Sequence, residues 1–140
     1  ILSLIRSLGF SIGFTNGCFD MLHRGHIKYL DEARKSSDFL FIGLNDDSSV
    51  KKLKGKDRPI NNVRDRIEML RRATFDDAFI IKFNESTPLK LIKKIKPDIL
   101  IKGGDYKIND FVKKYNGKVK TIPFVKGCSS SNIIEKIKKT

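Results

Sequence analysis

Short apolar runs alternate with amphipathic stretches along the chain, and this alternation predicts the order of its strands and helices. Phe39–Leu44 is a continuous apolar run, which is typical of a strand buried in a parallel sheet. His23–Lys35 carries Ile27, Leu30 and Ala33 at helical spacing, so it predicts a helix with one apolar face. The predicted strands span residues 10–15, 39–44, 78–83, 99–101 and 119–124.

Local start and stop residues indicate further helices. Asn62 can cap a helix whose first turn contains Asp65. Thr87 followed by Pro88 is a typical helix start, and Pro97 ends the helix that they begin. The predicted helices cover residues 1–6 (the end of a helix), 23–35, 63–73, 87–96, 108–115 and 129–139, and residues 45–61 are predicted to form a long polar loop.

This order of elements predicts the fold class. Strands that alternate with helices imply an α/β fold, here a Rossmann-like five-stranded parallel sheet with helices on both faces. No internal repeat or linker-like segment divides the chain, so we expect residues 1–140 to form a single domain. Ligands of such sheets bind beyond the carboxyl ends of the strands, and each motif described below falls in a loop at that edge.

Charge and apolar content narrow the possible partners. Apolar residues make up 39% of the 140 residues, and no apolar run reaches the roughly 18 residues of a membrane span, so we expect no membrane partner. No secretory signal is evident, which favours a cytoplasmic location. The net charge of +13 favours anionic partners, namely nucleic acid, acidic lipid or phosphorylated small molecules, although scattered lysines are also typical of a solvated surface.

The two cysteines, Cys18 and Cys128, are far apart in the sequence and form no CxxC pair. They therefore predict neither a disulfide framework nor a cysteine-rich zinc site.

The first candidate site is the segment Thr15–His26, TNGCFDMLHRGH, which follows the first predicted strand and opens the first long helix. Gly17 permits a tight turn, and Gly25 removes a side chain where a ligand approaches. Free N–H groups at a helix start attract phosphate. His23 and His26 share one helix face, where two imidazoles can donate hydrogen bonds to charge that develops on phosphoryl oxygens.

Two other interpretations of this segment compete. The histidines can be surface residues at a helix cap, but both histidines of the chain fall in one HxGH unit after a strand and a glycine. His23, His26 and Asp20 can also form a zinc site, although metal-binding helices more often space histidines four apart and no other ligand is obvious.

The second candidate is the basic stretch Lys51–Pro59, KKLKGKDRP. Arg58 can grip a phosphate with two hydrogen bonds, and Arg66 in the next helix can point at the same anion. A solvated basic loop and a surface arginine are the alternatives.

Two further candidates come later in the chain. In Lys102–Tyr106, paired glycines permit close approach of a ligand, Asp105 can accept from a hydroxyl group, and Tyr106 can stack on a ring; a plain turn is the alternative. In Gly127–Asn132, the hydroxyl groups of Ser129–Ser131 lie at a predicted helix start, where they can cap the helix or help to hold a pyrophosphate.

Taken together, these motifs resemble those of the cytidylyltransferase-like nucleotidyltransferases, over about residues 14–139. Within that family, TNGCFDMLHRGH, LKGKDRP, IKGGDY and GCSSSNII most resemble the adenylyltransferase domain of ADP-heptose synthase, which acts in lipopolysaccharide core synthesis. Glycerol-phosphate cytidylyltransferases resemble the chain less closely, because they carry an arginine shortly before the glycine-serine motif, where this chain has Lys126.

The resemblance implies an enzyme that transfers AMP from ATP to D-glycero-β-D-manno-heptose 1-phosphate, with Mg²⁺ held mainly by phosphates and no metal held by the protein itself. It implies that His23, His26 and Lys54 are catalytic and that Arg58, Arg66 and Tyr106 bind the acceptor substrate. The implied nucleotide-binding residues are Thr15, Asn16, Gly17, Cys18, Phe19, Asp20, Gly25, Gly103, Asp105, Ser129, Ser130 and Ser131. It also implies a homodimer.

Three alternatives remain open at this point. The same chemistry can serve another acceptor, with CTP and glycerol 3-phosphate or another polyol phosphate, or with ATP and flavin mononucleotide. A fragment of an aminoacyl-tRNA synthetase can share HxGH, but here Ser129–Ser131 stand in place of a lysine-rich signature. A non-enzymatic nucleic-acid binder would use the positive charge but gives no reason for HxGH at a strand-to-helix turn, so we expect no nucleic-acid partner.

Overall fold

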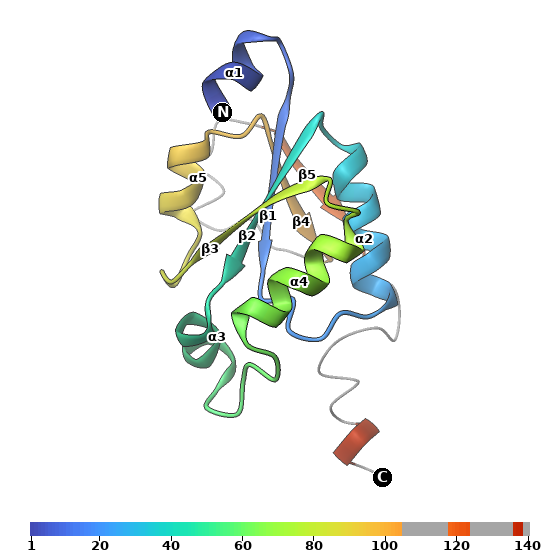
Figure 1. The fold of residues 1–140 in the computed structure, drawn as a ribbon, viewed down its shortest axis with the longest axis vertical. Coiled ribbons are helices and arrows are strands. Elements are labelled where there is room, and N and C mark those ends of the chain that lie inside the picture. Colours follow the sequence, from blue (N-terminus) through green and yellow to red (C-terminus); the bar gives the residue numbers. More distant parts are fainter. Residues whose placement is uncertain (105–117, 124–135, 139–140) are drawn as a thin grey trace.

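A computed structural model of the protein describes residues 1–104, 118–123 and 136–138. Its centre is a five-stranded sheet with the strand order β3-β2-β1-β4-β5, in which every neighbouring pair is parallel (Figure 1). The strands are β1 (Ile12–Gly17), β2 (Phe39–Asn45), β3 (Ala78–Phe83), β4 (Ile99–Gly103) and β5 (Lys118–Ile122). The predicted Rossmann-like α/β class and the five-stranded parallel sheet are confirmed.

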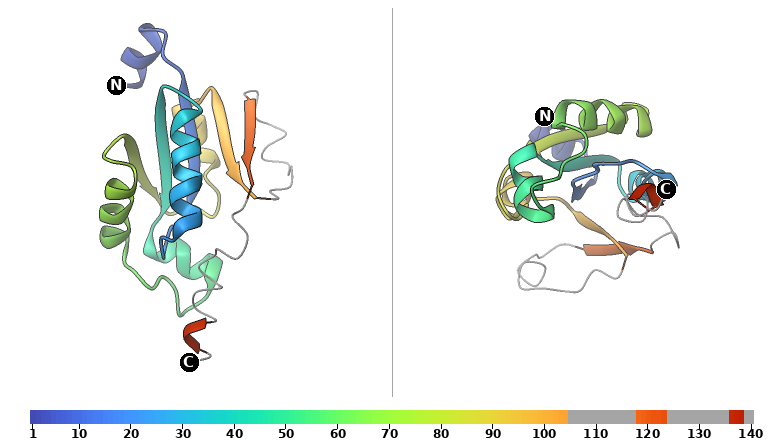
Figure 2. Two further views of the ribbon diagram at one scale, coloured as in Figure 1. Left: turned by 90° about the vertical axis from the view of Figure 1, so that its right-hand side faces the viewer. Right: turned by 90° about the horizontal axis from the view of Figure 1, so that it is seen from below.

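Helices cover both faces of this sheet, and Figure 2 shows α2 lying along one of them. The helices are α1 (Leu2–Ser7), α2 (Arg24–Lys35), α3 (Asp47–Lys54), α4 (Val63–Ala73) and α5 (Leu89–Ile95). Leu30 of α2 and Leu70 of α4 are fully buried against one face, whereas Ile5 of α1 and Ile92 of α5 pack on the other. Within the described residues, no helix is long and apolar enough to cross a membrane.

The first strand begins and ends two residues later than predicted. Asn16 and Gly17 still pair with β2, opposite Gly43 and Leu44, so the turn starts only after Gly17. The expected reason for this glycine is therefore wrong: a Cβ at Gly17 would lie 2.9 Å from the Phe19 ring, and the positive φ of the loop, 45°, belongs to Phe19. A glycine is needed at position 17 because the Phe19 ring packs against it, and the loop turns at Phe19 itself.

The prediction of a loop throughout residues 45–61 is also wrong, because Asp47–Lys54 forms helix α3. Asp46 caps this helix, and its side chain accepts from the backbone N–H of Ser49. An acidic residue in the first turn and lysines in the last turn suit the helix dipole. Apolar periodicity missed the helix because only Val50 of its residues is an apolar side chain buried in the core.

The other predicted helix boundaries agree closely with the structure. Asn62 caps α4, and its side chain accepts from the N–H of Asp65 at 2.9 Å. Pro88 itself is the N-terminal cap residue of α5, one residue later than predicted. Lys96 adopts a left-handed conformation before Pro97 and ends α5. The predicted helices over residues 108–115 and 129–139 lie outside the described residues, apart from residues 136–138.

Candidate active site

The two histidines lie at the start of α2, just beyond the carboxyl end of β1. His23 is the N-terminal cap residue, and its Nδ1 accepts a hydrogen bond of 3.1 Å from the Gly25 N–H. His26 Nδ1 accepts in turn from the His23 N–H at 3.3 Å. The two rings stack with their centroids 3.9 Å apart. The two imidazoles of HxGH thus form a reciprocal helix cap. A capping role is therefore confirmed, and it is compatible with the phosphate-binding interpretation.

This cap determines where the imidazole protons lie. Because each Nδ1 accepts a backbone N–H, the proton of each neutral ring is on Nε2. Burial lowers the pKa of His26 to about 4, with a further contribution from His23 and an opposing one from the Met21 backbone. Burial also lowers the pKa of His23. The free protein therefore holds a neutral imidazole pair at pH 7 with its N–H groups on the Nε2 side.

Asp20 ties the loop after β1 to the segment before α4. Its carboxylate is almost fully buried and accepts from Arg58 Nε at 2.7 Å and from the N–H groups of Ile60 and Asn61, each at 2.8 Å. Burial alone would raise the pKa of Asp20, but the hydrogen bonds from Asn61, Ile60 and Arg58 outweigh it and hold the pKa below its usual value. Asp20 is therefore an ionised anchor whose oxygens are already engaged.

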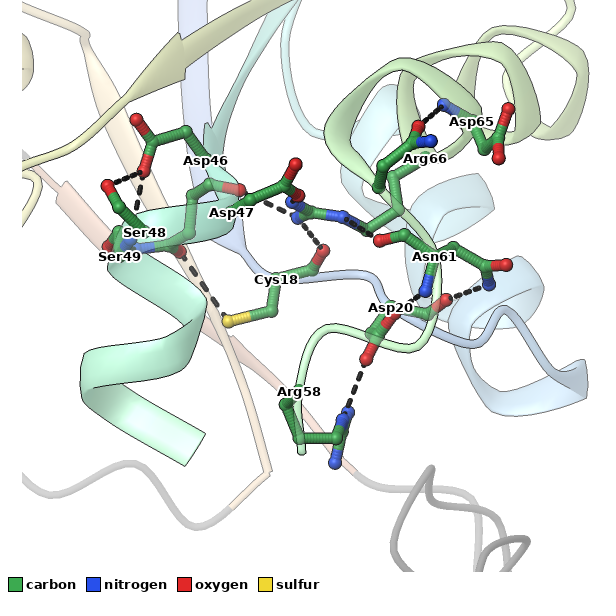
Figure 3. A network of polar contacts seen from close by, with 12 residues as sticks. Cys18, Asp20, Asp46, Asp47, Ser48, Ser49, Arg58, Asn61, Asp65 and Arg66 are labelled. Atoms are coloured by element: carbon green, nitrogen blue, oxygen red, sulfur yellow. Dashed lines mark hydrogen bonds and ion pairs between the residues drawn. The ribbon is translucent and has the colours of Figure 1, made fainter. Parts of the chain in front are cut away.

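Arg66 joins three segments of the same region (Figure 3). Its side chain is fully buried, which excludes the alternative of a surface arginine. Nη1 donates to the carbonyl oxygens of Cys18 and Asn45 at 2.8 and 2.6 Å. Nε donates to the Asn61 carbonyl, and Nη2 donates to an Asp47 carboxylate oxygen. Four of its five N–H groups are thus engaged within the protein, and this geometry favours loop positioning over a direct grip on phosphate.

The charges of the three predicted cations act on the Cys18 thiol. Lys54, Arg66 and Arg58, in that order, favour its thiolate electrostatically. Burial outweighs them and raises the pKa of the Cys18 thiol. The thiol therefore stays protonated and is a poor nucleophile. Of these cations, Lys54 is exposed, at the last position of α3.

The carboxyl ends of β1 and β4 carry a second group of polar side chains. Lys102 Nζ donates to Asn16 Oδ1, and both belong to the central strands. Thr15 and Tyr29 share a hydrogen bond of 2.6 Å between their hydroxyl groups, and the Tyr29 hydroxyl also donates to the Ile101 carbonyl. Burial raises the pKa of Tyr29 to about 12, so its hydroxyl stays neutral. Lys102 opens the candidate segment Lys102–Tyr106 but was given no role in it, and Tyr29 was not predicted as part of the site.

The remaining predicted residues have mixed outcomes. Gly103 lies beside Tyr29, whose ring would be 3.2 Å from a Cβ at that position. Asp105, Tyr106 and Ser129–Ser131 lie outside the described residues, so their predicted roles stay predictions. Within residues 1–104, 118–123 and 136–138, no group of three or more His, Cys, Asp and Glu side chains is arranged to hold a metal ion.

Comparison with known proteins identifies the family. A family model described as cytidylyltransferase-like matches residues 14–137, which is most of the chain. The chain belongs to the cytidylyltransferase-like family. It is 52% identical over 130 residues to the bifunctional protein HldE of Helicobacter hepaticus and 52% identical over 134 residues to HldE of Aliarcobacter butzleri. These matches cover 92% and 95% of this chain but only 27% and 28% of the two relatives.

Solved structures agree with this assignment. A lipopolysaccharide core biosynthesis protein from Thermoplasma volcanium superposes with a TM-score of 0.67 and 28% sequence identity, over 84% of this chain and 98% of that one. A pantoate-beta-alanine ligase from Francisella tularensis, with a TM-score of 0.58 and 18% identity over 99% of this chain and 76% of that one, shares the fold. The predicted family resemblance is therefore confirmed.

Proposed function

We propose that this domain transfers AMP from ATP to a sugar 1-phosphate, D-glycero-β-D-manno-heptose 1-phosphate, and releases pyrophosphate. The observation that carries the proposal is the pair of stacked, neutral imidazoles at the start of α2, in a chain about half identical to HldE proteins. The similarity to a lipopolysaccharide core biosynthesis protein supports the same pathway class.

The reaction needs alignment and charge neutralisation more than proton transfer. A phosphate oxygen of the sugar phosphate attacks the α-phosphorus of ATP in line. The new P–O bond forms while the bond to the bridging oxygen breaks, and pyrophosphate leaves with that oxygen. The attacking oxygen is already ionised at pH 7, so the enzyme has to bring two polyanions together and offset their repulsion. Mg²⁺ enters with the triphosphate as its counter-ion.

Each part of the site then has a role. The imidazoles of His23 and His26 donate hydrogen bonds from Nε2 to oxygens of the triphosphate, where charge develops during transfer. A bound polyphosphate would raise both histidine pKa values and strengthen this interaction. Lys54, which is exposed at the end of α3, is free to move onto the departing pyrophosphate or the sugar phosphate.

The loops take their shape from the buried ionic contacts. Asp20 with Arg58, and Arg66 with the carbonyl oxygens around it, hold the segment after β1 against the segment before α4. We assign Arg58 and Arg66 to this positioning, in place of the direct contact with substrate expected from the sequence. The residues predicted to hold base, ribose and pyrophosphate are Gly103, Asp105, Ser129, Ser130 and Ser131, and Tyr106 stays a predicted residue of the acceptor site.

A pyrophosphate-release assay tests the proposal. The purified protein is incubated with Mg²⁺ and each of the four nucleoside triphosphates, against heptose 1-phosphate, glycerol 3-phosphate and flavin mononucleotide. We expect release only with ATP and heptose 1-phosphate. A preference for CTP with glycerol 3-phosphate would replace the proposal with cytidylyl transfer, for which the name of the family model is the supporting observation. No release from any pair by folded protein would contradict catalysis. A homodimer and a cytoplasmic location stay predictions.

A further inference from the structure

The strand order marks one place in the sheet where a ligand is expected. From β1 the chain passes through α2 to β2 and on to β3, and it then crosses through α5 to β4 on the other side of β1. The topological switch point therefore lies between β1 and β4. In open α/β sheets, ligands bind in the crevice beyond the carboxyl ends of the two strands at such a point.

Asn16 and Lys102 occupy the carboxyl ends of these two strands. Phe14 and Leu100 are direct partners across the β1–β4 pair, and both are buried in the core beneath α5. Asn16 and Lys102 each come two residues later, so alternation along the strands places them on the same face as those partners. Lys102 is only 7% exposed, and its Nζ donates to Asn16 Oδ1.

The chemistry of this hydrogen bond orients the Asn16 carboxamide. An ammonium group can only donate, so the atom of Asn16 that faces it must be the carbonyl oxygen. The NH₂ group of Asn16 then lies on the opposite side of the carboxamide, away from Lys102. An NH₂ group that is fixed in this way is a donor suited to a phosphate or ribose oxygen in the crevice.

Burial of the Lys102 ammonium group costs desolvation free energy. Burial lowers the pKa of the Lys102 ammonium to about 8. A buried ammonium destabilises the fold relative to an apolar side chain of the same length. Groups of this kind occur often where a ligand uses the charge or the hydrogen bond.

We propose that Lys102 is a positioning residue of the nucleotide site, which acts by holding the Asn16 carboxamide with its NH₂ group toward the bound nucleotide. This inference rests on the proposed function and adds a residue to it that the sequence motifs did not assign. Lys102 does not touch the reacting atoms in this account; its effect on the nucleotide passes through Asn16.

The test measures binding of the Mg²⁺ complex of α,β-methylene ATP by isothermal titration calorimetry. The variants are Lys102→Met, Asn16→Ala and the double variant. Lys82→Met, which makes the same change at an exposed lysine of the far edge strand β3, is the matched control. Each single variant should weaken binding about tenfold, as expected for loss of a hydrogen bond to a charged group. The double variant should also be about tenfold weaker, because both changes remove one interaction. Lys82→Met should bind like the wild type.

Two further measurements separate positioning from a structural role. Lys102→Met should remain folded at the assay temperature, checked by circular dichroism, while the KM for ATP rises and the KM for the sugar phosphate does not. Lys102→Gln keeps an N–H donor without the charge and should recover part of the lost affinity.

Several results would overturn the inference. These are wild-type affinity in Lys102→Met, a double variant weakened by the product of the single effects, or a KM for the sugar phosphate that rises as much as the KM for ATP. If the wild-type protein binds no ATP analogue, the proposed function fails together with this inference. If the wild type binds the analogue and Lys102→Met binds it equally well, only the role of Lys102 fails.

Discussion

Asp20 and Arg58 form a short ion pair, 2.7 Å between Oδ2 and Nε, in which the carboxylate side chain is 1% exposed and the guanidinium side chain 14% exposed. The pair joins the loop that leads to the histidines with the basic segment after α3. The two residues are 38 positions apart in the sequence, so the pair holds together two segments that local structure alone does not bring into contact.

Asp20→Asn should destabilise the protein by about 3 kcal/mol, since it leaves the Arg58 guanidinium and two backbone N–H groups without a carboxylate. The nucleotide affinity should fall as well, because the loop after β1 loses its anchor. Urea unfolding at pH 7 measures the first effect and calorimetric titration the second.

The control for this change is the exposed ion pair between Arg71 and Asp76, in which both side chains are more than half exposed. Asp76→Asn should cost less than 1 kcal/mol. Equal losses of unfolding free energy in Asp20→Asn and Asp76→Asn would show that burial of the Asp20–Arg58 pair does not increase its contribution to stability.

Arg66→Lys keeps the positive charge but loses the planar fork that reaches four acceptors. We expect a loss of about 3 kcal/mol in unfolding free energy and a clear loss of activity, because the carbonyl oxygens of Cys18 and Asn45 lose their donor. Thermal and urea unfolding measure the loss. Arg72→Lys, at an exposed pair with Glu68, should change stability by less than 1 kcal/mol.

His23→Asn separates helix capping from catalysis. Asparagine is among the best N-cap residues, so α2 should stay capped and the melting temperature should change little. The imidazole N–H is lost, and pyrophosphate release should fall about 100-fold or more, as for other donors that stabilise transition-state charge. Near-normal turnover in His23→Asn and in His26→Gln would limit both histidines to capping.

Stability should depend on pH through His26. Its usual pKa is 6.5, and burial lowers it to about 4 in the folded protein. Between these two pH values the unfolded chain binds a proton that the folded protein excludes, so acidification favours unfolding. The free energy of unfolding should fall, on the order of 2 kcal/mol from this group, as the pH drops from about 6.5 to 4.

His26→Gln should remove this part of the pH dependence and leave the smaller part due to His23, whose pKa is lowered in the same direction. Asp20, whose pKa lies below its usual 3.8, adds its own loss only at lower pH. Urea unfolding between pH 4 and 8 measures both variants. An unchanged slope in His26→Gln would contradict the neutral, buried state of this imidazole.

The sequence was sufficient for the fold because its signals are local. A continuous apolar run predicts β2, and the cap residue Asn62 predicts α4 to the residue. Helix α3 escaped prediction because its stability comes from the Asp46 cap and a favourable charge order, with a single apolar side chain in the core. The start of β1 was misplaced because Phe10 is apolar but exposed, and its ring meets the Phe39 ring edge to face before the strand begins.

The site was predicted only in part, because many of its contacts join residues that are far apart in the sequence. The spacing of HxGH is visible in the sequence. Arg66 is different, because the sequence shows only a polar residue on an amphipathic helix and its acceptors lie far away in the chain. Lys102 comes directly after the predicted strand 99–101 and resembles the first polar residue of a turn, although it lies within β4. Its proposed role depends on the hydrogen bond with Asn16. Contacts between residues 48 or 86 positions apart depend on strand order, which local patterns do not contain.

The hydrogen bond between Lys102 and Asn16 also bears on the order in which this end of the sheet is completed during synthesis. Asn16 lies on β1 and Lys102 on β4, and the chain passes through β2 and β3 before it reaches β4. A nascent chain that has completed β3 therefore already carries both histidines, yet it lacks Lys102. The Asn16 carboxamide gains this partner only after the crossover past β1 is made.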